Sequence, residues 1–501
     1  MAQALRPDGW AYLTGKISTI SLERYCRLYE ISMQVDYPFT IPVSSLLAKK
    51  YPLYPTLGIA GTAIGTVVAL LLIPENPYPA GNLMPSATAM TIGLLIAPTL
   101  ASLRNPQTAL RAEHLLVLAP VYWLLLDLLQ GAYALVQVDK EAIESAFIAI
   151  GLFVIGIWIA ALSRPRKLPK LLSKAATHHL NPKTIFRLIL IFFALGIFRF
   201  AYPSGFNPLV MIYYLGQNRW NAPWTRGQLG GWDAFLDHMA YFGYLLPTLT
   251  ILLALRSRWL DHRVIVSITL SLIMAAFYAQ GGNRRIIGVI FGASIICWIL
   301  EQHHLKIRHL IVLAFSIFLL LFSMQYMLEY RNTGFKKLFK NQPKELQYEH
   351  LHVDDNFLRL SQIIDIVPAS HSYIYHKQII FVLVRPIPRV LWSSKPVDPG
   401  FDLTKAVGMK GVSLSSSVIG EWYLSAGWLG VLFGGWIYGR LASITSLLLI
   451  RYSESAAPLV YSLSAMALFA GMRSMLDLVL MSYALLAWMF ITWVIFPINK
   501  K

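Results

Sequence analysis

The sequence has few charged residues and almost no cysteine. Only 14% of its 501 residues are charged, whereas ordinary soluble domains contain about 25%. Cys26 precedes the first long apolar segment and Cys297 lies within a later one, so we expect neither a disulfide framework nor a cysteine-based metal cluster. These shortages exclude an ordinary soluble enzyme and a disulfide-rich secreted scaffold.

Acidic residues are also scarce. The chain has 25 Asp and Glu against 43 Lys and Arg, which gives a formal net charge of +18. The basic residues occur mostly in short loops between apolar segments, as in the cytoplasmic loops of membrane proteins. We therefore attribute the charge to orientation in the membrane and to attraction by anionic lipids, and we predict no nucleic-acid partner. Residues 1–16 lack the apolar core of a cleavable signal, so the first spans are expected to direct insertion.

Long apolar runs make up most of the chain, and 56% of its residues are hydrophobic. Several runs continue for about 18 to 25 residues, the length that lets an α-helix cross the bilayer, and none shows the alternation of a β-barrel. We predict an all-α polytopic membrane protein with about twelve transmembrane helices and both termini in the cytoplasm. The expected spans are 56–73, 84–102, 114–136, 143–163, 184–202, 235–255, 264–279, 286–301, 310–328, 424–449, 457–471 and 475–496.

Two hydrophilic segments define the predicted domain organisation. Residues 1–54 form a cytoplasmic or interfacial segment, with an amphipathic helix expected over 21–35, and residues 55–501 form the membrane domain. Within this domain, residues 329–416 are predicted to form one large loop on the outer side. Loops of this length are usually functional.

Several basic residues depart from the orientation pattern, because the predicted topology places them at the outer face. A charged group at membrane depth is costly and usually faces a partner or a water-filled cavity. Arginine also makes bidentate bonds to phosphate oxygens, so these residues predict a diphosphate site. The alternative is that they pair with loop carboxylates or reach towards lipid phosphates. The residues are Arg199, Arg284, Arg285, Arg331, Arg385, Arg389, Lys395 and Arg473.

Other polar and aromatic residues allow two interpretations. Glu421, at the start of span 424–449, could be a general base towards a sugar hydroxyl or the counter-ion of an arginine. The Asp354–Asp355 pair is a weak candidate for holding a metal ion, and it suits a solvated turn equally well. Trp220 and Trp224 lie in an outer segment, where their aromatic faces could stack on sugar rings. Trp422 and Trp436 fit the aromatic belt at the membrane surface better than a substrate platform. No metal site is predicted, since the histidines lack an HExxH motif or a cysteine partner.

Glycines recur at small-xxx-small spacing in span 424–449. The pairs are Gly430 with Gly434 and Gly435 with Gly439. This spacing predicts close approach between helices rather than a role in chemistry.

The segment RPIPRVLWSSKP (385–396), followed by SSSVIGEWYLSAGWLGVLFGG (415–435), resembles the conserved region of O-antigen and related polysaccharide polymerases of the Wzy type. Arg389, ten residues and Gly400 match the RX10G pattern of that family. The turn QGGNRR (280–285) is similar to a turn that opens a span in the same proteins. The resemblance covers about residues 184–480, and a second RX10G pattern of some members is missing from residues 203–233.

The resemblance implies a GT-C-like glycosyltransferase of the bacterial inner membrane, with its large loop in the periplasm. It would polymerise oligosaccharide repeat units carried on undecaprenyl diphosphate, without metal or cofactor. Its implied partners are the lipid-linked substrate and membrane lipids, with a chain-length regulator protein as a further candidate. An O-antigen ligase is the alternative with the same chemistry. A transporter or flippase of lipid-linked sugars is the alternative from another class, but the middle parts of the spans are almost uncharged.

The predicted roles combine the outer arginines with this resemblance. Catalytic roles are assigned to Arg284, Arg285, Arg389 and Glu421. Supporting contacts to the substrate diphosphate are assigned to Arg331, Arg385, Lys395 and Arg473.

Overall fold

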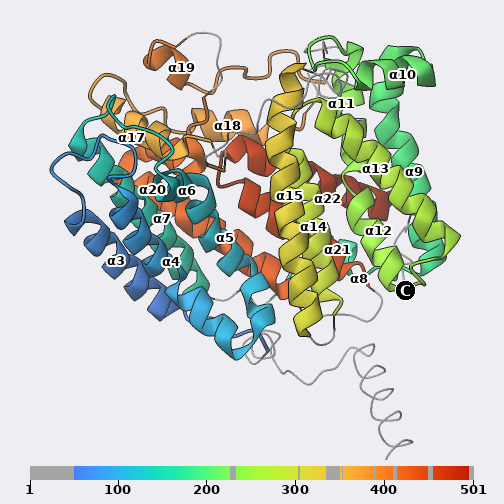
Figure 1. The fold of residues 1–501 in the computed structure, drawn as a ribbon, viewed down its shortest axis with the longest axis horizontal. Coiled ribbons are helices and arrows are strands. Elements are labelled where there is room, and N and C mark those ends of the chain that lie inside the picture. Colours follow the sequence, from blue (N-terminus) through green and yellow to red (C-terminus); the bar gives the residue numbers. More distant parts are fainter. Residues whose placement is uncertain are drawn as a thin grey trace, which may run out of the picture.

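The computed structural model describes residues 50–163, 165, 167–225, 233–302, 305–333, 350–351, 354–387, 391–409, 414–449 and 455–495. Its named elements are helices, and the one β-bridge between described residues joins His179 to Ser455 (Figure 1). The amphipathic helix predicted over 21–35 lies outside the described residues.

Nine helical segments among the described residues are long and apolar enough to cross a membrane. They are α4 (Met84–Arg104), the continuous α5 (Ala112–Pro120), π-helical Val121–Leu125 and α6 (Leu126–Gln130), α7 (Lys140–Leu162), α9 (Pro182–Ala201) with its 3-10 extension, α11 (Asp233–Gly243) with α12 (Leu246–Leu255), α13 (His262–Gln280), α15 (Ile307–Thr333), α20 (Ser417–Ser446) with its 3-10 extension, and α22 (Met475–Ile495). These helices confirm the predicted all-α polytopic class.

Three shorter helices coincide with the remaining predicted spans. They are α3 (Pro55–Leu71), α14 (Arg284–Leu300) and α21 (Ala457–Ala470). Each expected span therefore falls on a helix, although these three have fewer than 18 residues. The total of twelve spans and the GT-C relationship stay predictions.

The segment predicted as one large loop contains helices in its described parts. α15 continues to Thr333, and three short helices follow among the residues of this segment that the structure describes. They are α17 (Asn356–Ile366), α18 (Lys377–Leu383) and α19 (Leu403–Ala406), which lie together at one end of the molecule with α10 (Pro208–Leu215) (Figure 1). α17 also packs on α7, so this segment is joined to the membrane helices.

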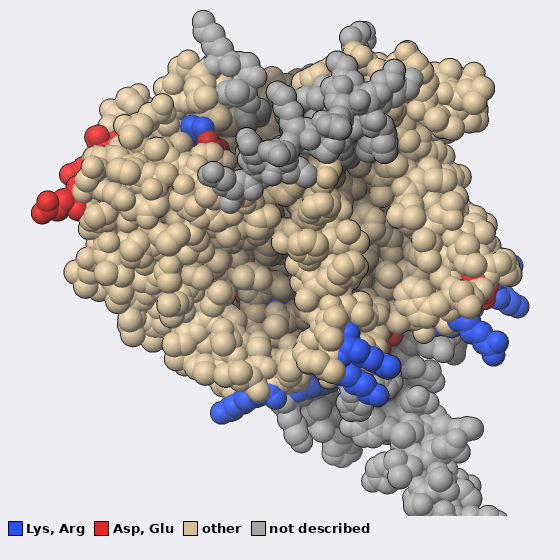
Figure 2. Space-filling model, viewed as in Figure 1, with Lys and Arg blue, Asp and Glu red and all other residues tan. Residues whose placement is uncertain are grey.

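The opposite end of the molecule is basic. Figure 2 shows most of the visible Lys and Arg side chains along this end, near α8 (Lys170–Thr177) in Figure 1. Exposed basic residues flank the helix termini here, and we refer to this surface as the basic end: Lys50, Arg104, Arg258, Lys306 and Arg308. This grouping agrees with the sequence, in which basic residues occur mostly in short loops between apolar segments.

The helices differ greatly in how much of their surface packs inside the protein. In the most apolar part of α7, 67% of the residues are buried, and this helix packs closely on α3 and α20. Only 6% of the corresponding part of α15 is buried, and its main packing partners among the described helices are α13 and α14. α7 therefore belongs to the core, whereas α15 lies at its edge.

Glycines allow α20 to pack against α7. A Cβ atom added at Gly435 would lie 2.0 Å from the carbonyl oxygen of Phe153, and one at Gly439 would lie 2.6 Å from that of Ile157. These two positions confirm the predicted close approach of helices. Gly156 makes the reciprocal approach, because its Cβ would meet the Leu432 carbonyl oxygen at 2.4 Å.

The other glycine pair has a different function. α20 is kinked at Ala426 and Gly427, where Gly427 has φ +59°, a conformation that favours glycine. The kink brings Trp422 back against Gly430 and Gly434. Gly430 and Gly434 therefore also allow two helical segments to approach closely, but these are the two parts of α20 on either side of the kink, which periodicity alone does not reveal.

Replacing Gly435 with alanine is expected to destabilise the protein by about 1–3 kcal/mol, because the added methyl group meets backbone that cannot rotate away. The matched control is Gly288→Ala, whose Cβ meets only the flexible side chain of Met324 at 3.3 Å. The measurement is the thermal unfolding midpoint of both purified variants in detergent. Equal midpoints would contradict the packing described for α7 and α20.

Candidate functional site

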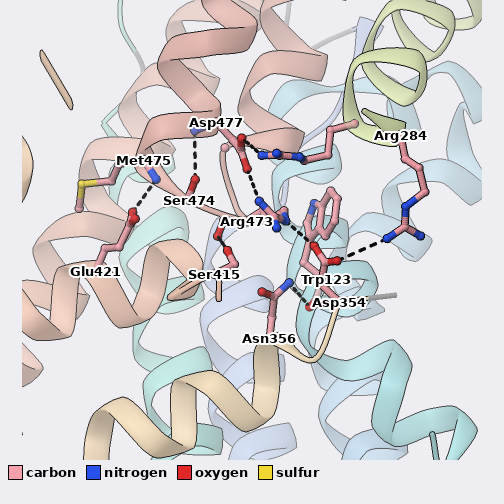
Figure 3. A network of polar contacts seen from close by, with 12 residues as sticks. Trp123, Arg284, Asp354, Asn356, Ser415, Glu421, Arg473, Ser474, Met475 and Asp477 are labelled. Carbon is pink, nitrogen blue, oxygen red and sulfur yellow. Dashed lines mark hydrogen bonds and ion pairs between the residues drawn. The ribbon is translucent and has the colours of Figure 1, made fainter. Parts of the chain in front are cut away.

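Three of the predicted arginines meet two aspartates at the end opposite the basic end (Figure 3). Asp354 accepts hydrogen bonds from Arg473 Nε and, at 3.5 Å, from Arg284. Asp477 accepts from Arg285 and, at 3.0 Å, from Arg473. We call these five residues the arginine–aspartate cluster. Its helices come from distant parts of the chain, so the cluster exists only in the folded protein.

A tight turn places the two adjacent arginines of the cluster. Gly282, with φ +68°, donates its N–H to the carbonyl of Ala279 at 2.8 Å and ends α13. Arg284 and Arg285 follow at once as the first residues of α14. This is the QGGNRR motif, whose glycine supplies the left-handed conformation that the turn requires.

The turn between α21 and α22 positions two more residues of the cluster, Arg473 and Asp477. Arg473 donates its backbone N–H to Ala470, and Ser474 Oγ accepts the N–H of Asp477 at 3.0 Å. This is the hydrogen bond of a helix N-cap, so it fixes the first turn of α22. Asp477 is 1% exposed and points to both neighbouring arginines.

Asp354 reaches the cluster from the segment before α17. The next helix is anchored by Asn356, whose Nδ2 donates to the carbonyl oxygen of Trp123 at 3.1 Å (Figure 3). Trp123 belongs to the π-helical turn inside the α5–α6 segment, and such turns leave a carbonyl available to an outside donor. Asp355 is separately paired with Arg359, so the two aspartates have different partners.

The charges of the cluster are nearly balanced. Burial raises the pKa of Asp354, but the neighbouring Arg473, Arg284 and Arg285 outweigh it and hold that pKa below its ordinary value of 3.8. The carboxyl group is therefore ionised at neutral pH. With three guanidinium groups and two carboxylates, the cluster carries one positive charge in excess.

Both interpretations of the outer arginines find support in this geometry. Pairing with carboxylates, the alternative to ligand binding, is present at each arginine of the cluster. Arginine forks that hold carboxylates also fit phosphate oxygens, which have similar bidentate geometry. The sequence interpretation treated Asp354 as a weak candidate, because nothing in the DD pair shows that it faces two arginines.

Lys395 and Arg385, two of the other predicted basic residues, do not belong to the cluster. Lys395 donates from Nζ to the carbonyls of Arg385 at 2.9 Å and Ile387 at 2.7 Å, so it closes its own loop. The guanidinium of Arg385 lies 5.9 Å from the ring centre of Phe381. Arg389 and the side chain of Arg331 lie outside the described residues, so their roles stay predictions.

Glu421 is buried beside the cluster rather than within it. It accepts hydrogen bonds from Gln378 Nε2 at 3.0 Å and from the backbone N–H of Met475 at 2.5 Å. These bonds tie α18 and α20 to the start of α22, next to Arg473 (Figure 3). The geometry favours a positioning role over the predicted role as a base.

A cavity of about 450 Å³ borders the cluster. Arg285 and Asp477 form part of its wall, and Trp220, Trp224 and Tyr241 supply aromatic surface. We call it the aromatic cavity. Arg199, another of the predicted outer arginines, also lines it and donates to the Trp224 carbonyl at 2.7 Å.

A second, larger cavity is lined mainly by apolar side chains. Its volume is about 930 Å³, and it lies between α12, α13, α14 and α15. Leu272, Phe291 and Leu319 are among its lining residues. We call it the apolar groove. It was not predicted from the sequence, because apolar residues that line a groove have the same periodicity as those that face lipid.

Comparison of the chain with protein-family models, curated proteins and solved structures finds no match. The function is therefore inferred from the chemistry of the cluster, of the aromatic cavity that borders it and of the apolar groove.

Proposed function

We propose that this protein is an inner-membrane glycosyltransferase that polymerises undecaprenyl-diphosphate-linked oligosaccharide repeat units at the periplasmic face. The observation that carries the proposal is the convergence of Arg284, Arg285 and Arg473 at the end opposite the basic end. Under the positive-inside rule the basic end faces the cytoplasm, which puts these arginines on the outer side. Three cations are disfavoured there unless they have partners, and their two aspartates leave one positive charge in excess for an anionic ligand.

The chemistry requires a site for a leaving diphosphate. An acceptor hydroxyl oxygen bonds to the anomeric carbon of the donor sugar while the bond from that carbon to the diphosphate oxygen breaks. The hydroxyl proton passes to a base, and the lipid diphosphate departs with added negative charge. Preorganised guanidinium groups stabilise this charge more in the transition state than in the ground state.

The apolar groove supports the same assignment. The helices that line it include α14, whose first two residues are Arg284 and Arg285. A lipid with its headgroup at the cluster would have hydrocarbon-lined space beside the same helix. A soluble anion would have no use for such a groove.

The direct test is extension of purified lipid-linked repeat units by the purified protein in detergent, with products separated on a gel. A ladder of longer chains is the expected result. Transfer of preformed long chains to a lipid acceptor, without extension, would instead identify a ligase. No covalent product, together with movement of the substrate across vesicle membranes, would identify a flippase.

A further inference from the structure

The aromatic cavity has a composition that neither the cluster nor the apolar groove shares. Trp220 is 57% exposed, so its indole contributes little to the core of the protein. The Arg219 guanidinium lies 4.1 Å from the centre of the indole ring and holds it in place. The ring of Tyr241 packs edge-on against Tyr483 at 4.4 Å between centroids. Two aromatic rings therefore line the cavity, each with a neighbouring side chain in contact with it.

Polar groups complete the cavity wall. Asn283, from the turn before α14, lies beside Arg285 and Asp477 among the lining residues. An amide, a guanidinium and a carboxylate can together donate to and accept from hydroxyl groups. By contrast, the Trp224 N–H is already donated to Gln280 Oε1 at 3.0 Å, and the Tyr278 hydroxyl to the Ala240 carbonyl. These two residues are therefore structural parts of the wall.

We infer that the aromatic cavity binds a sugar ring of the repeat unit, an inference that rests on the proposed function and adds a saccharide subsite to it. A sugar ring has apolar C–H faces and a polar edge of hydroxyl groups. The aromatic faces of the cavity can contact the C–H faces of the sugar, and its polar groups can hydrogen-bond to the hydroxyl groups. The cavity volume lies within the range of about 300–1,000 Å³ typical of small-molecule sites.

The boundary between the cavity and the cluster places the ring beside the diphosphate. Arg285 and Asp477 belong to both, whereas Arg284 and Arg473 do not line the cavity. A ring in the cavity could belong to the donor, next to its own diphosphate, or to the acceptor. The same binding chemistry serves both, so the experiment must separate them.

The test measures binding of two probes to the full-length protein in detergent micelles by calorimetry. One probe is the repeat-unit oligosaccharide released from the carrier lipid, and the other is the same oligosaccharide with a diphosphate at its reducing end. Trp220→Ala is expected to weaken binding of the released oligosaccharide about tenfold. The matched control is Trp392→Ala, an exposed tryptophan whose Nε1 donates to Ser394 and which does not line the cavity.

The diphosphate probe identifies the source of the ring. If the ring belongs to the donor, the probe with the diphosphate binds more tightly than the released oligosaccharide, and Trp220→Ala weakens the binding of both probes. If it belongs to the acceptor, Trp220→Ala weakens only the released oligosaccharide. Trp220→Phe should keep most of the affinity, and unchanged thermal midpoints will show that the variants are folded.

Two results would overturn the inference. One is full affinity of the folded Trp220→Ala variant for both probes. The other is absence of oligosaccharide binding to a protein that still extends lipid-linked units, which would leave the proposed function standing without this subsite. A protein that neither binds nor extends them would remove the proposed function itself.

Discussion

Arg473→Ala is expected to abolish long polysaccharide chains and leave single repeat units. Arg473 is the one residue of the cluster that contacts both Asp354 and Asp477, so it lies at the centre of the proposed diphosphate site. Removing one preorganised group that stabilises transition-state charge typically lowers a rate by about 10²–10³-fold. A loss of that size on every transfer would prevent chain growth.

The measurement is the length distribution of surface polysaccharide in cells whose own gene is replaced by the variant. Arg258→Ala is the matched control, because it removes an exposed arginine at the basic end. Arg473→Lys tests geometry, since lysine keeps the charge but cannot make a bidentate contact. Normal chains in a well-expressed Arg473→Ala variant would rule out the cluster as the catalytic centre.

Asp477→Ala is expected to destabilise the protein by about 3–5 kcal/mol, the usual cost of removing one partner from a buried ion pair. The side chain is 1% exposed and pairs with Arg285 and Arg473. Without it the cluster would carry two positive charges in excess. The measurement is the thermal unfolding midpoint in detergent. The control is Asp402→Ala, because Asp402 is 49% exposed, its ion pair is with exposed Lys405, and loss of its N-cap on α19 costs only about 1 kcal/mol.

Inorganic pyrophosphate should separate a ligand site from a purely structural ion pair. If the arginines bind diphosphate, the anion replaces the lost carboxylate and raises the midpoint of Asp477→Ala more than that of the unmodified protein. Equal shifts in the two proteins, or none, would indicate that Asp477 and its arginines only hold α14 and α22 together.

Most of the fold was predictable because membrane helices are encoded locally. Backbone groups in hydrocarbon must bond within their own segment, so each long apolar run specifies a helix without reference to the others. The twelve predicted spans all coincide with helices for this reason. The kink at Gly427 was missed because apolar periodicity continues through it, although the glycine itself marks the residue that can adopt φ +59°.

The candidate site was predictable only in its cations. Arg284, Arg285 and Arg473 stood out because their charge conflicts with their place at the membrane. Their partners could not be predicted, since Asp354 reaches Arg473 across 119 residues of sequence and Arg285 reaches Asp477 across 192. Glu421 shows the same limit, because its position near a helix start does not reveal that it accepts a hydrogen bond from the backbone N–H of Met475.

The contrast between α7 and α15 has a consequence for the evolution of this chain. Outside the apolar groove, side chains of α15 meet few protein atoms, so substitutions among Leu, Ile, Val and Phe should be nearly neutral there and accumulate freely. α7 is held by packing on two sides, including the approach of Gly156 to α20, and can accept few changes. Descendants of this protein should therefore preserve the sequence of α7 long after the residues of α15 outside the apolar groove have drifted beyond recognition.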